Sequence, residues 1–295
     1  MQLTAGWSTR GAGGAGAGLC VLASGRSTRL VVLSAFVVDI LVPLRRLYAL
    51  RLRRRLSSVA LPEHVALIMD GNRRWATKMG MANPSSGHQH GAAHALRVLS
   101  WCEQLGIRHV TVFVCSTENL IRRDQAEVAF LTQVIEQTVT EELAKPGGRW
   151  RVHVAGSLDL LPDGTAATLK HAVEITRDRD VVGEVTLAVG YGGRQELVDA
   201  VRELLYEAAA ADVSLAYLAT RLTTDDIGRH LDTTGQPDPD LVIRTSGEQR
   251  LSNFLLWQGV RSELYFCDAY WPAFREIDFL RALRTFAERN RRHNS

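Results

Sequence analysis

Cysteine is scarce in this sequence, which contains only Cys20, Cys102, Cys115 and Cys267. No two of them form a CxxC pair, which excludes a disulfide-stapled scaffold and a CxxC-type zinc site. Such sparse cysteine usage is typical of a reducing compartment, so we expect a cytoplasmic protein. The chain has 295 residues, of which 46% are hydrophobic and 23% charged, so there is ample material for a globular core.

Lysine is also rare, and the chain contains only Lys78, Lys145 and Lys170. None of them belongs to a GxxxxGK[ST] motif, which excludes a P-loop nucleotide-binding site. A GxGxxG pattern occurs at residues 11–16, but no apolar strand precedes it, and Gly/Ala repeats produce this pattern by chance. The sequence therefore does not indicate a dinucleotide-binding oxidoreductase.

Acidic residues are nearly absent from the first 60 residues. These contain nine arginines and a single acid, Asp39, whereas the whole chain has a formal net charge of +3. The rest of the chain is therefore mildly acidic, and we expect no nucleic-acid partner.

The N-terminal residues also lack a complete membrane span. Residues 1–29 consist largely of Gly, Ala, Ser, Thr and Arg, so we expect a disordered, low-complexity tail. Residues 30–44 are strongly apolar, but a span needs about 20 such residues, and Asp39 and Pro43 interrupt this run. A targeting segment and a translation start placed too far upstream both account for this stretch.

A basic amphipathic helix is predicted over residues 44–56. Leu44, Tyr48, Leu52 and Leu56 share one helical stripe, and arginines occupy other positions around the helix. This pattern favours peripheral contact with an anionic membrane surface, and it also favours packing of the leucines on the body of the protein. Residues 30–60 thus form a predicted N-terminal segment ahead of a domain at residues 61–295.

From residue 61 onward, short apolar runs alternate with amphipathic stretches. The apolar runs predict strands at residues 64–70, 109–116, 151–156, 185–191, 240–245 and 263–268. They are apolar on both faces, as buried parallel strands are. Helical periodicity predicts helices at residues 91–105, 124–144, 165–178, 194–211 and 278–291. This alternation predicts one α/β domain with a central, mostly parallel six-stranded sheet flanked by helices.

Polar and glycine-rich sequence accompanies several of the predicted strands. In a parallel sheet, ligands lie beyond the carboxyl ends of the strands. The polar segments are DGNRRW at 70–75, STEN at 116–119, GYGGR at 190–194 and RTSGEQRLSN at 244–253, and the sixth strand begins with Glu263. We expect these segments and Glu263 to gather at one edge of the sheet.

The carboxylates in this set suit a divalent cation. Asp70 and Glu263 offer hard oxygen ligands of the kind that Mg²⁺ prefers. Each has an ordinary alternative, because a carboxylate at a strand end is often a helix N-cap and Glu263 alone is compatible with a surface position. The joint occurrence of polar segments after several strands favours a functional site. The spacing of His88, His90 and His94 does not favour zinc.

Two groups of arginines suit phosphate. Arg73 and Arg74 supply planar guanidinium groups for phosphate oxygens, next to a glycine that lets backbone N–H groups approach an anion. Arg244, Arg250 and Ser252 form a second anion-binding set. Two separate sets predict that two phosphorylated groups bind at once.

Five segments of the sequence resemble the cis-prenyltransferase family, the isoprenyl transferases similar to undecaprenyl diphosphate synthase. They are HVALIMDGNRRW, CSTENL, VGYGGRQELVDAVREL, DPDLVIRTSGEQRLSNFLLWQ and SELYFCDAYWPAF, and they span about residues 62–292. The arrangement is most similar to short-chain actinobacterial members, which make Z,E-farnesyl diphosphate.

The resemblance implies a reaction, a cofactor and an assembly. The family joins isopentenyl diphosphate to an allylic diphosphate, here geranyl or farnesyl diphosphate, with a new cis double bond. It implies Mg²⁺ as cofactor and a homodimer by family analogy. It also implies an apolar tunnel for the growing chain, with walls from residues 91–105 and 124–144. Residues 61–295 are then the catalytic domain.

The resemblance further implies roles for individual residues. Asp70 is implied as the carboxylate that holds Mg²⁺ at the allylic diphosphate, and Glu263 as the second metal ligand. Asn119 matches the position usually assigned as proton acceptor, but an amide is a poor base, so we expect it to position groups while a diphosphate oxygen takes the proton. The residues implied near the allylic diphosphate are Gly71, Asn72, Arg73, Arg74, Trp75, His88 and Arg122. Those implied at the reacting centre are Ser116, Thr117 and Glu118. Those implied for isopentenyl diphosphate are Arg244, Arg250, Leu251 and Ser252.

Some residues depart from the family pattern. Many members have glycine where Arg73 stands, so the allylic site carries an additional cation. Val114 stands where long-chain members tend to have alanine, and a bulkier side chain there predicts early termination of the product. The alternatives are a long-chain polyprenyl diphosphate synthase and a non-catalytic scaffold subunit of the same fold.

Overall fold

The computed structural model describes residues 47–293 of the protein. Contacts divide the chain into two units, residues 1–48 and 49–295. The predicted tail at 1–29 and the apolar run at 30–44 lie outside the described residues. Residues 47–56 are helical, and Leu52 and Leu56 of this helix are buried in the hydrophobic core of the second unit.

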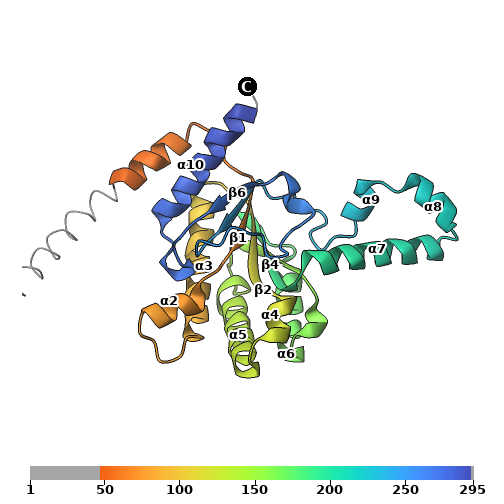
Figure 1. Cartoon of the computed structure of the whole chain (residues 1–295), viewed down its shortest axis with the longest axis horizontal. Coiled ribbons are helices and arrows are strands. Elements are labelled where there is room, and N and C mark those ends of the chain that lie inside the picture. The colour runs from red at the N-terminus through yellow and green to blue at the C-terminus, as the bar shows by residue number, and fades with distance from the viewer. Residues whose placement is uncertain (1–46, 294–295) are drawn as a thin grey trace, which may run out of the picture. The chain divides into compact units, whose positions relative to one another are not determined.

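A six-stranded sheet forms the centre of residues 49–295 (Figure 1). Its strands are β1 (His64–Ile68), β2 (His109–Ser116), β3 (Trp150–Ala155), β4 (Gly183–Tyr191), β5 (Leu241–Arg244) and β6 (Glu263–Phe266). Every neighbouring pair is parallel, in the order β3-β4-β2-β1-β5-β6. The predicted α/β fold is confirmed, and the sheet is entirely parallel. The chain builds outward from β1 on one side and returns to its other side with β5, which is the arrangement that opens a crevice at the carboxyl ends of the strands.

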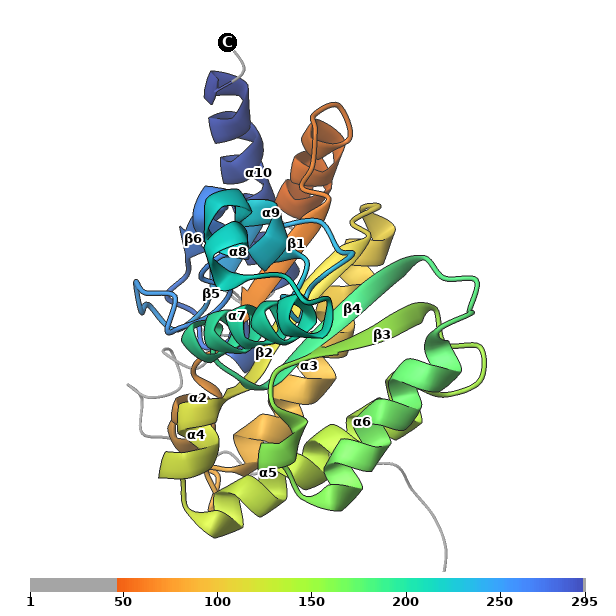
Figure 2. The same ribbon diagram turned by 90° about the vertical axis from the view of Figure 1, so that its right-hand side faces the viewer.

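Helices flank this sheet, and Figure 2 shows α5 and α6 in a layer beside β3 and β4. The longer ones are α3 (Ser86–Gln104), α5 (Gln125–Thr138), α6 (Asp163–Thr176), α7 (Gly193–Ala210) and α10 (Glu276–His293). The shorter ones are α2 (Asn72–Lys78), α4 (Thr117–Arg122), α8 (Leu215–Arg221) and α9 (Thr224–Gly228). A π-helical turn, Val139–Leu143, continues α5. Among the helices of residues 47–293, none combines the length and the apolar character needed to span a bilayer.

Residues of each central strand alternate between two apolar cores. Val65 and Leu67 of β1 face the larger core, which also contains side chains of α3, α5, α6 and α10. Ala66 and Ile68 face the smaller core, where Phe254 covers the sheet. Burying a large aliphatic side chain contributes about 1.5–3 kcal/mol relative to leaving it exposed. Packing on both faces therefore fixes the strand ends, and with them the loops that follow.

Candidate active site

Asp70 follows β1 and provides the central carboxylate of the site. Its Oδ2 accepts a hydrogen bond from Arg244 Nη2 at 2.9 Å, and its Oδ1 accepts one from Arg74 Nη2 at 3.0 Å. Burial by itself raises the pKa of Asp70, but the hydrogen bond from Arg244 and the charges of both arginines outweigh it and lower the pKa below its ordinary value. Asp70 is therefore held as an anion.

The turn after β1 holds Asp70 in place through its backbone. The carbonyl oxygen of Asp70 accepts hydrogen bonds from Thr245 Oγ1 at 2.8 Å and from Trp271 N at 3.0 Å. Gly71 has a φ of 101°, and a Cβ at this position would lie only 2.7 Å from Cδ1 of Tyr270. Only glycine combines this backbone conformation with such a close approach.

Arg244 ends β5 and is buried, with 4% of its surface exposed. Its Nη1 donates hydrogen bonds to Ser252 Oγ at 2.7 Å and to the backbone oxygen of Arg250 at 2.5 Å. Because Nη2 binds Asp70, Arg244 connects the second predicted anion set to the first.

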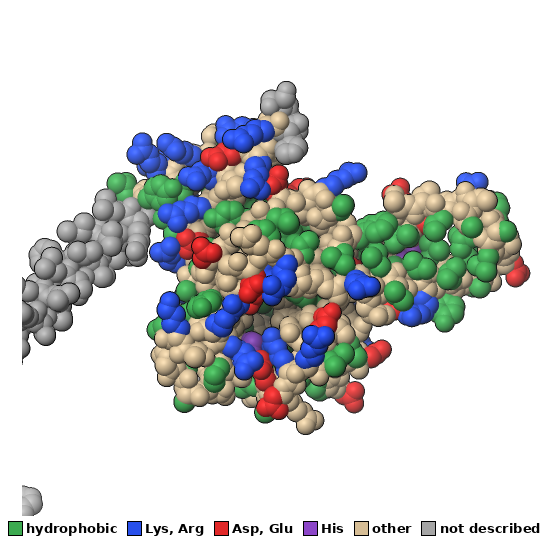
Figure 3. All heavy atoms as spheres, in the orientation of Figure 1, with side chains coloured by type: hydrophobic (Ala, Val, Ile, Leu, Met, Phe, Trp, Pro, Cys, Tyr) green, Lys and Arg blue, Asp and Glu red, His purple; other side chains and the backbone are tan. Residues whose placement is uncertain are grey.

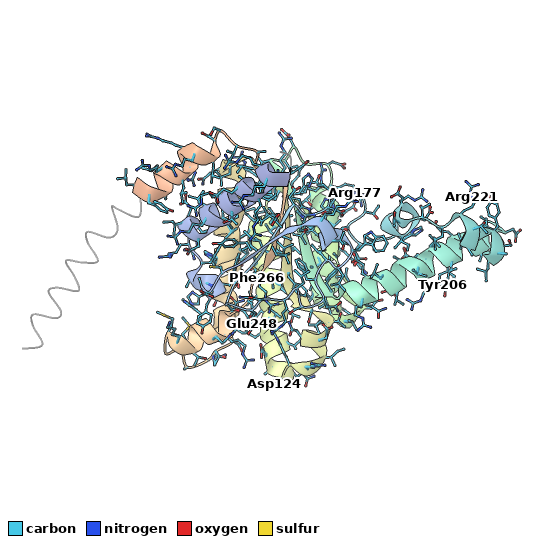
Figure 4. The ribbon with its side chains drawn as sticks, turned by 45° about the horizontal axis from the view of Figure 1, so that its top comes forward. Asp124, Arg177, Tyr206, Arg221, Glu248 and Phe266 are labelled. Carbon is cyan, nitrogen blue, oxygen red and sulfur yellow. The ribbon has the colours of Figure 1, made fainter. Side chains whose placement is uncertain are left out.

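Glu248 also lies between the two arginine sets. Its Oε2 is 2.5 Å from Arg250 Nη1, and its Oε1 is 3.7 Å from Arg74 Nη1. The loop of Glu248 lies at the carboxyl end of β6, because Gly247 N donates a hydrogen bond to Cys267 O at 2.9 Å; Figure 4 labels Glu248 and Phe266. The two arginine sets predicted from the sequence therefore meet at the carboxyl edge of the sheet.

The loop after β5 contains most of the left-handed backbone conformations outside glycine. Within residues 47–293, the non-glycine residues with positive φ are Asp212, Ser246, Ser252, Asn253 and Leu255. Such conformations are uncommon and gather at functional sites. The loop is held by Asn253, whose backbone and side-chain oxygens accept hydrogen bonds from Gly193 N at 2.8 Å and Arg194 N at 2.9 Å.

The STEN segment forms the junction between β2 and α4. Ser116 Oγ accepts a hydrogen bond from Asn119 N at 3.1 Å and caps the helix. Thr117 Oγ1 donates to a backbone carbonyl at the end of β4 at 2.9 Å. Glu118 Oε1 accepts from Asn253 Nδ2 at 3.1 Å. The segment thus lies against the loop after β5, as expected for strand ends that share one edge.

A second carboxylate, Glu127 of α5, gathers three basic side chains. It lies 2.9 Å from Arg73 Nη1, 3.2 Å from His88 Nε2 and 3.2 Å from Arg123 Nη1. Burial, together with the charge of Arg123, lowers the pKa of His88. Glu127 is not among the residues predicted from the sequence, because a glutamate near the start of an amphipathic helix is usually a solvent-exposed residue. No local sequence signal distinguishes it.

An apolar cavity of about 80 Å³ lies between the sheet and helices α3 and α5. Asn72 and His88 line it on the side of the charged site, and Val114 lines it from β2. The remaining walls come from α3, α5, the π-helical turn, β2 and β4. Residues from both segments expected to wall the tunnel, 91–105 and 124–144, line this cavity, and a charged edge adjoins it.

Glu263 does not join the other predicted site residues within one chain. It begins β6 and is paired in register with Leu241, whereas Arg244 is paired with Phe266. At about 3.3 Å per residue, this register places Glu263 roughly 10 Å from the carboxyl edge. Its Oε2 lies 2.8 Å from Arg289 Nη1. The expectation that Glu263 gathers with the polar segments is wrong for a single chain, because Glu263 is the first residue of its strand while those segments lie at the carboxyl ends of theirs.

The other predicted site residues surround this edge more loosely. The Trp75 ring lies 5.0 Å from that of His90, between centroids. Asn72 Nδ2 donates to a backbone oxygen at 3.3 Å, and Leu251 packs against the smaller core. Arg122 is exposed on α4.

The donors around Asp70 fit Mg²⁺ shared with a substrate. Within residues 47–293, no three potential metal-ligating side chains converge. Proteins commonly bind Mg²⁺ through one or two carboxylates, with substrate phosphates and water completing the shell. A single ionised carboxylate beside arginines is therefore compatible with a metal that arrives with a phosphorylated substrate.

The fold and the site together define a parallel α/β protein in which a carboxylate between arginines adjoins an apolar cavity. A sequence model of the family described as "Putative undecaprenyl diphosphate synthase" matches residues 68–294. The chain belongs to this family, and the resemblance carried by the five segments is confirmed.

Proteins similar to this chain are named as isoprenyl transferases or as diphosphate synthases. The chain is 67% identical over 250 residues to an isoprenyl transferase of Streptomyces fradiae, covering 84% of this chain and 96% of the relative. It is 53% identical over 251 residues to a (2Z,6E)-farnesyl diphosphate synthase of Thermobifida fusca, covering 85% and 97%. A crystal structure of lavandulyl diphosphate synthase from Lavandula x intermedia, in complex with dimethylallyl diphosphate, matches with a TM-score of 0.71 and 33% identity, covering 77% and 95%.

Proposed function

We propose that this protein is a Mg²⁺-dependent cis-prenyltransferase that condenses isopentenyl diphosphate with a short allylic diphosphate. One observation carries the proposal: Asp70 lies between two arginine sets at an edge that adjoins an apolar cavity. A substrate with a diphosphate head and a hydrocarbon tail matches both parts. Its product is a short-chain Z-isoprenyl diphosphate, in agreement with the names of the relatives.

Asp70 is the proposed ligand of Mg²⁺ at the allylic diphosphate. Its lowered pKa favours the ionised form that a metal requires. When bound, Mg²⁺ would neutralise the negative charge that develops on the leaving diphosphate. The residues proposed to bind this diphosphate and the first part of its chain are Gly71, Asn72, Arg73, Arg74, Trp75, His88 and Arg122.

The second set is proposed to hold isopentenyl diphosphate so that its alkene faces C1 of the allylic substrate. It consists of Arg244, Arg250, Leu251 and Ser252. A carbon–carbon bond forms at C1 as the diphosphate leaves with the electron pair of the C–O bond, and the new unit then loses a proton. Holding two substrates together removes much of the entropic cost of a bimolecular reaction.

The STEN segment is proposed to line the reacting centre, with Ser116, Thr117, Glu118 and Asn119. Asn119 is a positioning residue in this proposal, because its amide is too weak a base to accept the proton. A diphosphate oxygen is the proposed acceptor.

A homodimer is the proposed assembly, and its support is an apolar face on the arm formed by α7, α8 and α9. Val198, Val201, Leu205 and Tyr206 recur at helical spacing on α7, with exposed fractions of 51%, 40%, 40% and 69%. Figure 3 shows hydrophobic side chains gathered over this arm, and Figure 4 shows Tyr206 on it. Monomers seldom expose such faces without a partner. Any role of Glu263 at the metal of Asp70 would require a second copy of the chain.

Peripheral contact of the N-terminal segment with a membrane is a further part of the proposal. Leu52 and Leu56 are buried, while Arg51, Arg54 and Arg55 of the same helix are exposed. Exposed arginines on one helix suit anionic lipid head groups. Sedimentation with vesicles of anionic or neutral phospholipid tests this, and binding to anionic vesicles should fall when all three arginines are replaced by glutamine.

A product assay tests the proposed activity. The purified protein receives labelled isopentenyl diphosphate, Mg²⁺ and either geranyl or farnesyl diphosphate, and products are resolved by length and double-bond geometry. A C15 product with one new cis bond is expected from geranyl diphosphate. Long polyprenyl products would refute the short-chain assignment. Absence of product with both primers would refute the proposed enzymatic activity and favour the alternative of a non-catalytic scaffold subunit.

A further inference from the structure

We propose that Glu127 is a positioning residue that holds Arg73 in the unliganded protein and releases it to the allylic diphosphate. The inference rests on the proposed function, because it assumes that a diphosphate binds beside α2. In this proposal Glu127 opposes primer binding, because its buried carboxylate competes with the substrate for the guanidinium group of Arg73.

The guanidinium group of Arg73, which the sequence predicts to bind the substrate diphosphate, is paired with Glu127 instead. Arg73 Nη1 lies 2.9 Å from Glu127 Oε2, while Arg74, the next residue of α2, donates to Asp70 instead. Successive residues of a helix point in directions about 100° apart, so the two arginines face different neighbours. Arg74 is already directed to the metal-binding carboxylate of the proposal, whereas Arg73 is directed to α5.

Of the three basic partners of Glu127, Arg73 is the one placed to move. Its side chain is 54% exposed, compared with 24% for Arg123 and 8% for His88. A long, half-exposed side chain can exchange partners without disturbing the core, whereas His88 is fixed between α3 and α5. A neighbour of Arg73, Asn72, lines the cavity, so the exchange takes place where the polar head meets the hydrocarbon tail.

Glu127 keeps its charge compensated when Arg73 leaves. The side chain of Glu127 is only 8% exposed, and an unpaired charge at such a site is costly. Arg123 remains 3.2 Å from its Oε1 and provides the compensating charge, while His88 keeps its hydrogen bond to the same oxygen at 3.2 Å. A diphosphate carries more negative charge than one carboxylate, so the electrostatic attraction of Arg73 to the diphosphate is stronger than its attraction to Glu127. The competing contact with Glu127 lowers the net affinity for the primer.

The test measures binding of geranyl diphosphate by calorimetry, with Mg²⁺ present and isopentenyl diphosphate omitted so that no condensation occurs. Glu127→Gln should tighten binding about fivefold, the scale of one partly exposed ion pair. Arg73→Gln should weaken it. In the Arg73→Gln background, adding Glu127→Gln should change the affinity little, because the cation for which the two anions compete is gone.

Two further variants separate this role from a merely structural one. Glu127→Asp retains the carboxylate and should return the affinity toward that of the wild type. Glu174→Gln removes one negative charge from an exposed pair on α6, and it should leave the affinity unchanged. Melting temperatures of all variants establish that each one is folded.

The inference would be overturned if Glu127→Gln weakened binding or left it unchanged, or if it tightened binding equally in the Arg73→Gln background. A failure of the proposed function has a different signature, since the wild-type protein would then not bind geranyl diphosphate at all.

Discussion

Arg244 Nη2 lies 2.9 Å from Asp70 Oδ2, although the two residues are 174 positions apart in the sequence. The contact exists because β1 and β5 are neighbours in the sheet, with Ile68 and Arg244 paired in register. The other oxygen of Asp70 binds Arg74. One carboxylate therefore anchors an arginine from each anion-binding set, and a cation that binds Asp70 competes with both guanidinium groups.

Replacing Asp70 should separate activity from stability. Asp70→Ala should lower kcat by at least about a hundredfold, the scale found when a group that stabilises transition-state charge is removed. Arg244 keeps its hydrogen bonds to Ser252 and to the backbone of Arg250, so the free energy of unfolding should fall by no more than about 1–3 kcal/mol. Steady-state kinetics and thermal unfolding of this variant, with Asp70→Asn as the shape-matched control, check both parts. Near-normal turnover of either variant would show that Asp70 is not the essential carboxylate.

The sheet could be predicted from the sequence because its strands are buried on both faces. Runs such as residues 109–116 place apolar side chains on both faces of the strand, and this pattern can be recognised without knowledge of the neighbouring strands. The short helices could not be predicted in the same way. α4 and α9 have too few residues to show a helical period, and the caps at Ser116 and Thr223 are defined by hydrogen bonds that form only in the folded chain.

The site could be predicted in part, and the two misses have different causes. Asp70 follows β1 and Arg244 ends β5, so strand polarity alone places them at one edge. Glu263 begins its strand and therefore lies at the opposite end of the sheet. The prediction that it joins the other polar residues did not take the direction of its strand into account. Glu127 acquires its importance from burial and from partners on α2 and α3, and no local pattern records such contacts.

Enlarging the cavity at Val114 should lengthen the product. Val114 lines the apolar cavity from β2, and Val114→Ala removes two methyl-sized groups from its wall. We expect products beyond C15 in the chromatographic assay, with a stability loss of roughly 0.8 kcal/mol per group removed. Val260→Ala is the matched control, because Val260 is 77% exposed and does not line this cavity. An unchanged C15 product from Val114→Ala would place the limit on chain length elsewhere.

Adding a methyl group at residue 71 should damage the turn that presents Asp70. Gly71→Ala forces an alanine into a φ of 101° and places its Cβ 2.7 Å from Tyr270 Cδ1. We expect a loss of about 1–3 kcal/mol in unfolding free energy and a raised KM for the allylic diphosphate. Gly80→Ala is the control, because Gly80 also has positive φ but nothing lies within 4 Å of its added Cβ. Equal effects of the two substitutions on KM would show that backbone strain alone, and not the contact with Tyr270, is responsible.

The free energy of unfolding should fall as the pH decreases from about 6.5 toward 4, in part because of His94. This side chain is 2% exposed among Trp101, Trp271 and Phe274, and burial, aided by the charge of Arg97, lowers its pKa from 6.5 to about 4. In the unfolded chain the imidazole takes up a proton near pH 6.5, whereas in the folded protein it stays neutral until about pH 4. The unfolded state therefore binds more protons in this window, so the contribution of His94 is present above pH 6.5 and is lost on acidification.

Between pH 7 and pH 5, His94 alone should account for about 2 kcal/mol of that loss. Urea unfolding at a series of pH values measures it, and His94→Phe should flatten the curve because a phenyl ring does not titrate. If His94→Phe kept the full pH dependence, the proton uptake would have to come from other groups, and the buried, neutral state of His94 would not contribute to acid sensitivity.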